Sequence, residues 1–266
     1  MSGGRRRVHA TFWLLDAPDS LALQSRQNPD GYGIATFEPD GIAEIAKRPA
    51  AAYADTAFAR EARDECSTTF LAHVRYASVG GLSPENTHPF VQDGRAFAHN
   101  GHFTGLDALD AHLGDARSLV HGQTDSERYF ALITSLIRDD VGAAIVEAAT
   151  WIAAELPLYA LNCIVATPTD LWALRYPDTH ELYVLERPGG RYLEAASAAG
   201  RIRVRSGDMA DTPSVLIASE RMDENPDWRL LEPGELVHVD ADLRVTATLA
   251  LPHRPAHPLG DQPAAA

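Results

Sequence analysis

Ala96-Phe97-Ala98-His99-Asn100-Gly101 is the stretch that decides how the rest of the chain is interpreted. Its apolar first half is typical of a buried strand, which we expect over residues 95–99. The Asn-Gly pair that follows tolerates the left-handed backbone of a tight turn. The same pair can aim a side-chain amide and a bare backbone N–H at one point, which is the chemistry of an oxyanion hole. Asn100 and Gly101 are therefore candidate catalytic residues, with an ordinary hairpin turn as the alternative.

The composition predicts one large globular domain with a short tail. The chain has 266 residues, of which 45% are hydrophobic, and we expect the domain to cover residues 1–251. Residues 252–266 are rich in Pro and Ala and are expected to be a disordered tail. No apolar run approaches the roughly 18 residues of a membrane span, and the N-terminus lacks a secretory core. We therefore expect a cytoplasmic protein with no membrane partner.

Charge and cysteine content exclude several classes of partner. The formal net charge is −14, and nucleic acid as a partner is not expected because binding phosphates requires a basic surface. Cys66 and Cys163 are far apart in apolar contexts and are interpreted as reduced thiols of the core. No metal-ligand spacing such as Cys-x-x-Cys or His-Glu-x-x-His occurs in the sequence, so no metal and no cofactor are expected.

The order of the expected elements indicates an α+β fold. Strands are predicted first, over 33–37 and 68–74 among others. Two adjacent helices follow over 124–138 and about 141–155, and after residue 158 the pattern returns to short strands. Strands and helices that are segregated in this way are typical of antiparallel sheets covered by helices.

The first of these helices carries a candidate site residue. Thr124 lies three residues before Glu127, which predicts a capping box and places Asp125 in the first helical turn. An acid in this position can simply interact with the helix dipole, or it can receive a cationic group of a ligand.

Several motifs occur in the order found in one known family. Residues 73–78 (His-Val-Arg-Tyr-Ala-Ser), 86–90 (Asn-Thr-His-Pro-Phe), 98–101 (Ala-His-Asn-Gly) and 124–127 (Thr-Asp-Ser-Glu) resemble the motifs of class II glutamine amidotransferases, as do 30–33 (Asp-Gly-Tyr-Gly) and 233–236 (Pro-Gly-Glu-Leu). The resemblance covers residues 12–245. It implies the N-terminal-nucleophile hydrolase fold, a four-layer αββα sandwich of two antiparallel sheets.

The resemblance also implies a role for each candidate site residue. The Arg75 guanidinium would bind the α-carboxylate of glutamine with two parallel hydrogen bonds. The Asp125 carboxylate would bind the α-ammonium. Ser78 would support the carboxylate through its hydroxyl or nearby backbone N–H groups. Asn100 and Gly101 would stabilise the tetrahedral oxyanion. For Arg75, a structural ion pair is the alternative.

Histidines are not required as bases in this scheme. In the family, the α-amine of the nucleophile itself moves the proton, and an α-amine with a pKa of about 8 suits this task. We therefore interpret His88 and His99 as structural residues.

The N-terminus of the chain differs from the family pattern. The family nucleophile is a cysteine exposed by removal of the initiator methionine, whereas this chain begins Met1-Ser2-Gly3-Gly4. One explanation is that the true start lies upstream, where a strand of about five residues preceded by Met-Cys would restore the pattern. The others are a relative without a nucleophile, or Ser2 acting as the nucleophile.

Two functions remain open on this evidence. The first is an enzyme that hydrolyses glutamine or a γ-glutamyl amide through an N-terminal cysteine that these residues do not include. Its ammonia could pass to a separate partner protein. The second is a nucleophile-less module that binds a glutamine-like ligand or another protein.

Overall fold

The first of two stacked layers is a six-stranded antiparallel sheet. The computed structural model describes residues 1–77, 80–189, 193–196, 203–206 and 212–260. The strand order in this sheet is β16-β15-β9-β8-β7-β6, and each neighbouring pair is antiparallel. The strands are β6 (Phe90–Gln92), β7 (Arg95–Asn100), β8 (Asn162–Ala166), β9 (Leu171–Leu174), β15 (Glu235–Val239) and β16 (Val245–Leu249).

The second layer consists of two three-stranded antiparallel sheets. Their strand orders are β3-β2-β5 and β13-β10-β14. The strands are β2 (Gly31–Phe37), β3 (Ala43–Arg48), β5 (Leu71–Arg75), β10 (Tyr183–Arg187), β13 (Ser214–Ala218) and β14 (Arg229–Leu230).

The first residues of the chain lie between these two small sheets. Ser2 forms antiparallel bridges both to Thr69, which precedes β5, and to Val215 of β13. The Ser2 N–H donates to the Val215 carbonyl at 2.8 Å, and the Val215 N–H donates back at 3.0 Å. The N-terminal segment thus joins the two three-stranded sheets at one end.

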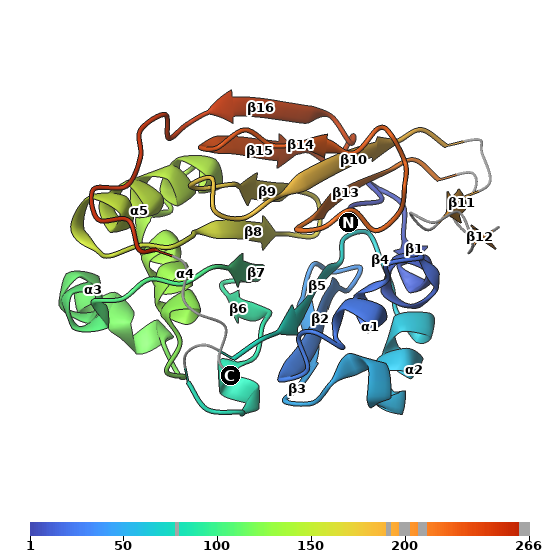
Figure 1. The fold of residues 1–266 in the computed structure, drawn as a ribbon, viewed down its shortest axis with the longest axis horizontal. Coiled ribbons are helices and arrows are strands. Elements are labelled where there is room, and N and C mark those ends of the chain that lie inside the picture. The colour runs from blue at the N-terminus through green and yellow to red at the C-terminus, as the bar shows by residue number, and fades with distance from the viewer. Residues whose placement is uncertain (78–79, 190–192, 197–202, 207–211, 261–266) are drawn as a thin grey trace.

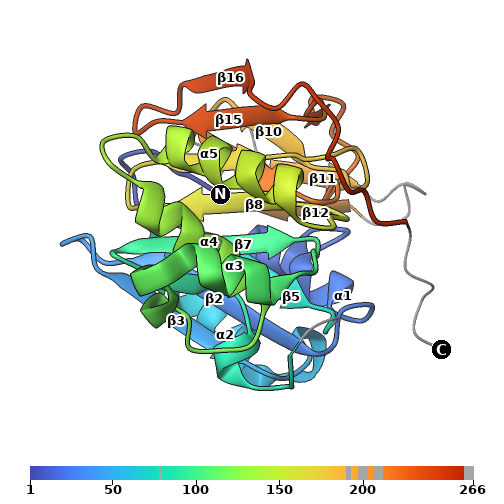
Figure 2. The same ribbon diagram turned by 90° about the vertical axis from the view of Figure 1, so that its left-hand side faces the viewer.

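Helices cover both outer faces, which makes four layers. Figure 1 shows α3, α4 and α5 on one side of the stacked sheets and α1 and α2 on the other, and Figure 2 looks onto the α3–α5 layer in front of β7 and β8. The helices are α1 (Leu21–Gln24), α2 (Thr56–Asp64), α3 (Leu106–Leu113), α4 (Asp125–Leu136) and α5 (Val141–Glu155), and a π-helical turn η1 spans Phe12–Asp16.

Side chains of β7 alternate between two cores. Phe97 packs with Tyr129, Phe130 and other residues of the helix layer, whereas Ala96 and Ala98 pack between the two sheets. This is the alternation that a strand buried on both faces requires. The α+β class and the four-layer αββα sandwich predicted from the sequence are confirmed.

The long elements predicted from the sequence are present with small shifts at their ends. The helix expected over 124–138 is α4, and the helix expected over 141–155 is α5. The remaining short elements are β1 (Val8–His9), β4 (Cys66–Ser67), β11 (Leu193–Ala196), β12 (Arg203–Ser206), η2 (Ala52–Ala54), η3 (Pro84–Asn86) and η4 (Gly114–Leu119). Within the described part of the chain, no helix is long and apolar enough to cross a membrane.

The segment after residue 251 differs from the disordered tail expected there. The Ala256 N–H donates to the carbonyl of Ala153 in α5 at 2.8 Å, and the Leu259 N–H donates to the Leu158 carbonyl at 2.8 Å. Residues 252–260 are therefore held on the core by backbone hydrogen bonds, which a count of Pro and Ala does not reveal. Residues 261–266 lie outside the described residues.

Candidate active site

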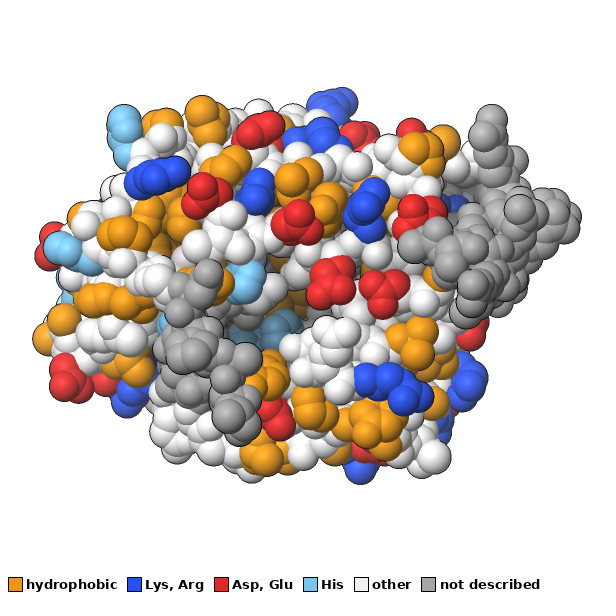
Figure 3. Space-filling model, viewed as in Figure 1, with side chains coloured by type: hydrophobic (Ala, Val, Ile, Leu, Met, Phe, Trp, Pro, Cys, Tyr) orange, Lys and Arg blue, Asp and Glu red, His pale blue; other side chains and the backbone are white. Residues whose placement is uncertain are grey.

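One cavity brings together the residues predicted to form the site. It has a volume of about 290 Å³, and Arg75, Asn100, Gly101 and Asp125 all line it. Figure 3 shows a hollow near the centre of one face, with histidine side chains inside it and acidic side chains along one edge. Ser78, the fifth predicted residue, lies outside the described residues.

Arg75 is the last residue of β5 and is 4% exposed. Its guanidinium donates to the carbonyls of Gly81 and Gly80, each at 3.4 Å. Burial lowers the pKa of Arg75, and the negative charges of Asp30 and Asp125 oppose this shift. A guanidinium at the wall of a cavity suits a carboxylate ligand.

The Asp-Gly-Tyr-Gly motif, whose last three residues begin β2 and are not the turn expected from the sequence, supports the end of β5. The Asp30 N–H donates to the Arg75 carbonyl at 3.0 Å, and the Asp30 carboxylate accepts from the Ala77 N–H at 2.8 Å. A Cβ atom at Gly33 would lie 2.2 Å from the His88 carbonyl oxygen, so only glycine allows the 86–90 segment to approach this closely.

Asp125 is the first residue of α4, and its carboxylate is held in place from two sides. Oδ2 accepts from the Phe103 N–H at 3.1 Å, and Oδ1 accepts from the Ser126 N–H at 2.8 Å. The Thr124 hydroxyl caps the helix by accepting from the Glu127 N–H at 3.2 Å. These bonds leave further lone pairs of the carboxylate for a cationic ligand.

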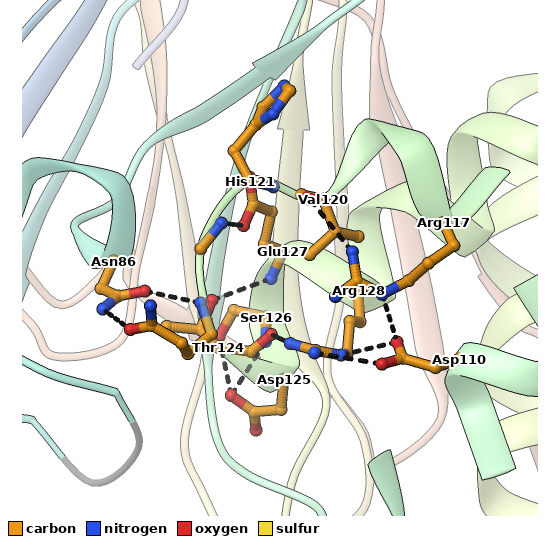
Figure 4. A network of polar contacts seen from close by, with 12 residues as sticks. Asn86, Asp110, Arg117, Val120, His121, Thr124, Asp125, Ser126, Glu127 and Arg128 are labelled. Atoms are coloured by element: carbon orange, nitrogen blue, oxygen red, sulfur yellow. Dashed lines mark hydrogen bonds and ion pairs between the residues drawn. The ribbon is translucent and has the colours of Figure 1, made fainter. Parts of the chain in front are cut away.

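Only half of the predicted capping box is found. The Glu127 carboxylate does not close onto Thr124; it accepts from the backbone N–H groups of His121 and Gly122, at 3.0 Å and 2.6 Å. The loop before α4 is thereby tied to the first turn of the helix, as Figure 4 shows.

Asn100 and Gly101 lie where β7 leaves the sheet. Asn100 is the last residue of the strand and pairs with Asn162 of β8. A Cβ atom at Gly101 would lie 2.1 Å from the Ala160 carbonyl oxygen, so the position accepts only glycine. Both residues are half-buried and line the cavity, and an amide side chain and a backbone N–H at one strand end are the groups that an oxyanion hole needs.

Three histidines line the cavity, of which His88 and His99 are buried and His73 is half-buried. The rings of His73 and His88 lie 4.3 Å apart between centroids. Burial lowers the pKa of His73 to about 4 and places the pKa of His88 well below its usual range, with the neighbouring His73 adding to the second shift. These imidazoles are therefore neutral near pH 7.

His99 is fixed by two hydrogen bonds. Its Nε2 donates to the Ala160 carbonyl at 3.1 Å, and its Nδ1 accepts from the Ser126 hydroxyl at 2.9 Å, a tautomer assigned from these partners. Burial lowers the pKa of His99, while the negative charge of Asp125 opposes the shift. His99 thus links β7 to the first turn of α4.

The two cysteines differ in their relation to the cavity: Cys163 is buried and lines it, whereas Cys66 does not line it. The Cys163 sulfur lies 3.6 Å from the Tyr129 hydroxyl in the helix-side core, and burial raises the pKa of this thiol to about 12. Cys66 lies in β4, paired with His9. Among the described residues, no group of three or more His, Cys, Asp or Glu side chains could hold a metal ion.

The cavity also extends as a slot between β5 and β13. Phe70, Ala72 and Val74 line one side, and Leu216, Ile217 and Ala218 line the other. The backbone of Met1 closes one end: its carbonyl accepts from the Phe70 N–H at 2.9 Å, and its α-amine donates to the Phe70 carbonyl at 2.9 Å. Burial lowers the pKa of this amine to about 5.

The class II glutamine amidotransferase family matches residues 20–259, and the chain belongs to this family. An uncharacterized protein of Methanocaldococcus jannaschii, MJ1515, is 32% identical over 82% of this chain and 63% of its own length. A γ-glutamyl-hercynylcysteine sulfoxide hydrolase of Mycolicibacterium smegmatis is 30% identical over 88% of this chain and 92% of its own length.

Solved structures support the fold. A glutamine aminotransferase class-II domain protein from Silicibacter pomeroyi covers 82% of this chain with a TM-score of 0.58 and 22% identity, and the alignment spans 90% of that protein. An allosteric regulatory enzyme of purine biosynthesis covers 93% of this chain with a TM-score of 0.63 and 16% identity, over 49% of its own length. The N-terminal-nucleophile hydrolase fold is thus shown.

Proposed function

We propose that this protein hydrolyses the side-chain amide of glutamine, or of a γ-glutamyl compound, in the cavity between β5, β7 and α4. The observation that carries this proposal is the convergence of Arg75, Asp125 and the Asn100–Gly101 pair on one cavity. Membership in the amidotransferase family and the name of the M. smegmatis relative support the same class of substrate.

The two charged residues define the binding half of the site. The Arg75 guanidinium pairs with the α-carboxylate of the substrate, and the Asp125 carboxylate accepts from the α-ammonium. Both groups are buried, so each interaction forms in a medium of low dielectric and gains strength accordingly. Ser78 completes this half of the site in the proposal.

The reaction proceeds through a thioester. A cysteine thiolate attacks the γ-carbonyl carbon, and the oxyanion that forms is stabilised by the Asn100 side-chain amide and the Gly101 N–H. The C–N bond then breaks, and the leaving ammonia or amine takes the proton that came from the thiol. Water hydrolyses the thioester, which releases glutamate and restores the thiol.

The slot between β5 and β13 is where the cysteine would lie. In the antiparallel register of Ser2 with Thr69, Met1 opposes Phe70, and a residue five positions before Met1 would oppose Arg75. An extended segment in the slot would also join the two small sheets along their whole length and replace the buried amine with a peptide bond. We propose that such a segment carries the cysteine, and that its free α-amine acts as the base.

The second candidate is a nucleophile-less module that binds a glutamine-like ligand. It is favoured by the placement of the two cysteines, since burial raises the pKa of the Cys163 thiol and Cys66 does not line the cavity. For the enzyme, a separate protein that accepts ammonia is the proposed partner when the substrate is glutamine.

The test is turnover by matched versions of the chain. We expect no glutaminase activity from residues 1–266, and activity from a version preceded by cysteine and four strand-forming residues after a removable methionine. A version with one residue fewer shifts the cysteine out of register with Arg75 and should be inactive, as should a Cys→Ala version. Equal activity in all versions, or none in any, would overturn the enzymatic proposal.

A further inference from the structure

A separate loop adjoins each charged residue of the site, one after Arg75 at the end of β5 and one before Asp125 at the start of α4. The loop after β5 supplies the carbonyls of Gly80 and Gly81, which accept hydrogen bonds from the Arg75 guanidinium. The loop of residues 121–124 leads into α4 and ends directly before Asp125. The spacing between guanidinium and carboxylate therefore depends on how these two loops are held together.

Asn86 connects the two loops through its side-chain amide. Its Nδ2 donates to the Gly81 carbonyl at 3.1 Å and to the Gln123 side-chain oxygen at 2.6 Å. Its Oδ1 accepts from the Gln123 backbone N–H at 2.8 Å. The side chain is 1% exposed, and Figure 4 shows it facing the loop before α4. Both donors of the amide are thus used between the loops.

Both loops approach the Asn86 side chain closely at a glycine. A Cβ atom at Gly80 would lie 2.9 Å from Asn86 Nδ2, and one at Gly122 would lie 2.5 Å from Asn86 Oδ1. On its other side, the 121–122 backbone is held by the Glu127 carboxylate. Glycine on each loop allows the amide to sit between them.

We infer that Asn86 is a positioning residue that sets the separation between Arg75 and Asp125, and so selects ligands with a carboxylate and an ammonium on one carbon. The inference rests on the proposed function for the identity of the ligand. Asn86 itself does not line the cavity, so it acts through the two loops and not by touching substrate.

The test compares three ligands with one charged group removed at a time. L-Glutamine carries both groups, glutaramate lacks the ammonium, and 4-aminobutanamide lacks the carboxylate. By calorimetric titration, Asn86→Ala should weaken L-glutamine binding about tenfold or more and change binding of the other two by less than about threefold. Gln123→Ala keeps the backbone N–H bond to Asn86 and should show a smaller loss for L-glutamine.

A second readout does not depend on ligand. Hydrogen exchange of the Gln123 amide should become faster in Asn86→Ala, because that N–H loses its acceptor. Ser67→Ala is the matched control: it removes a buried hydroxyl that bonds to Phe37 outside the cavity, and it should lower stability without changing either readout at the site.

The outcomes separate the two proposals. If the unchanged protein fails to bind L-glutamine, the proposed function is overturned, and hydrogen exchange alone decides whether Asn86 couples the loops. If the unchanged protein binds and Asn86→Ala binds L-glutamine within about twofold of it, or exchange at Gln123 is unaltered, the positioning role is overturned.

Discussion

At the scale of single residues, Asp125 shows how the fold prepares a charged group before any ligand arrives. Its two oxygens already accept backbone hydrogen bonds from Phe103 and Ser126. The side chain therefore loses little conformational freedom when a cation binds, which favours affinity. The sequence predicted the residue and its place in the first helical turn, but not the Phe103 contact, because nothing local in the sequence brings residue 103 to residue 125.

The histidines that line the cavity make stability depend on pH. The folded pKa of His73 is about 4, below its usual 6.5, so between these values the unfolded chain binds more protons than the folded one. Stability should be fully present above pH 6.5 and should fall as the pH drops toward 4, by up to about 1.4 kcal/mol per pH unit for each such group. Chemical unfolding at a series of pH values measures this.

The His73→Gln variant separates the contribution of His73 to the pH dependence of stability from the contributions of the carboxylates. In this variant the free energy of unfolding should depend less steeply on pH in the same range. A slope equal to that of the unchanged protein would contradict the assignment of a low pKa to His73.

At the scale of elements, the sequence predicted best what is long and periodic. The α4 and α5 helices were predicted because apolar residues recur on one face over three or more turns. The α2 and α3 helices, at 9 and 8 residues, were not predicted. Helices this short gain their stability from tertiary packing, and α3 follows a left-handed Gly105 without a side-chain cap.

The cap of α4 should matter for binding, and the cap of α5 should not. Thr124 accepts from the Glu127 N–H at 3.2 Å, and Asp140 accepts from the Ala143 N–H at 3.1 Å. Thr124→Ala and Asp140→Ala should each lower the free energy of unfolding by about 1 kcal/mol. Only Thr124→Ala should also weaken L-glutamine binding, because it loosens the turn that holds Asp125. Equal effects of both variants on binding would contradict this account.

At the scale of the whole molecule, the site is formed by parts that are distant in the sequence. The end of β5, the end of β7 and the start of α4 meet at one cavity, and the slot beside them is bordered by β5 and by β13. The motifs predicted which residues belong together through their resemblance to a family. They could not predict the slot, since Ser2 reaches both Thr69 and Val215 only once the sheets have formed.

The positioning role that we infer for Asn86 also depends on contacts between parts that are distant in the sequence. The Asn-Thr-His-Pro-Phe motif in the sequence does not predict a role for Asn86, because its partners Gly81 and Gln123 belong to different loops. His88, two residues further on, likewise contacts a residue distant in the sequence, with its ring tilted against that of His73. Residues of this kind become visible only from tertiary contacts.

The proposed site is tested most directly by calorimetric titration of L-glutamine into the protein that carries the cysteine segment, alongside its Asp125→Asn variant. We expect saturable binding at one site, and a loss of about tenfold or more in affinity when the charge of Asp125 is removed. The absence of binding, or equal affinity in the two proteins, would contradict the claim that Arg75 and Asp125 hold the two charged ends of an amino acid.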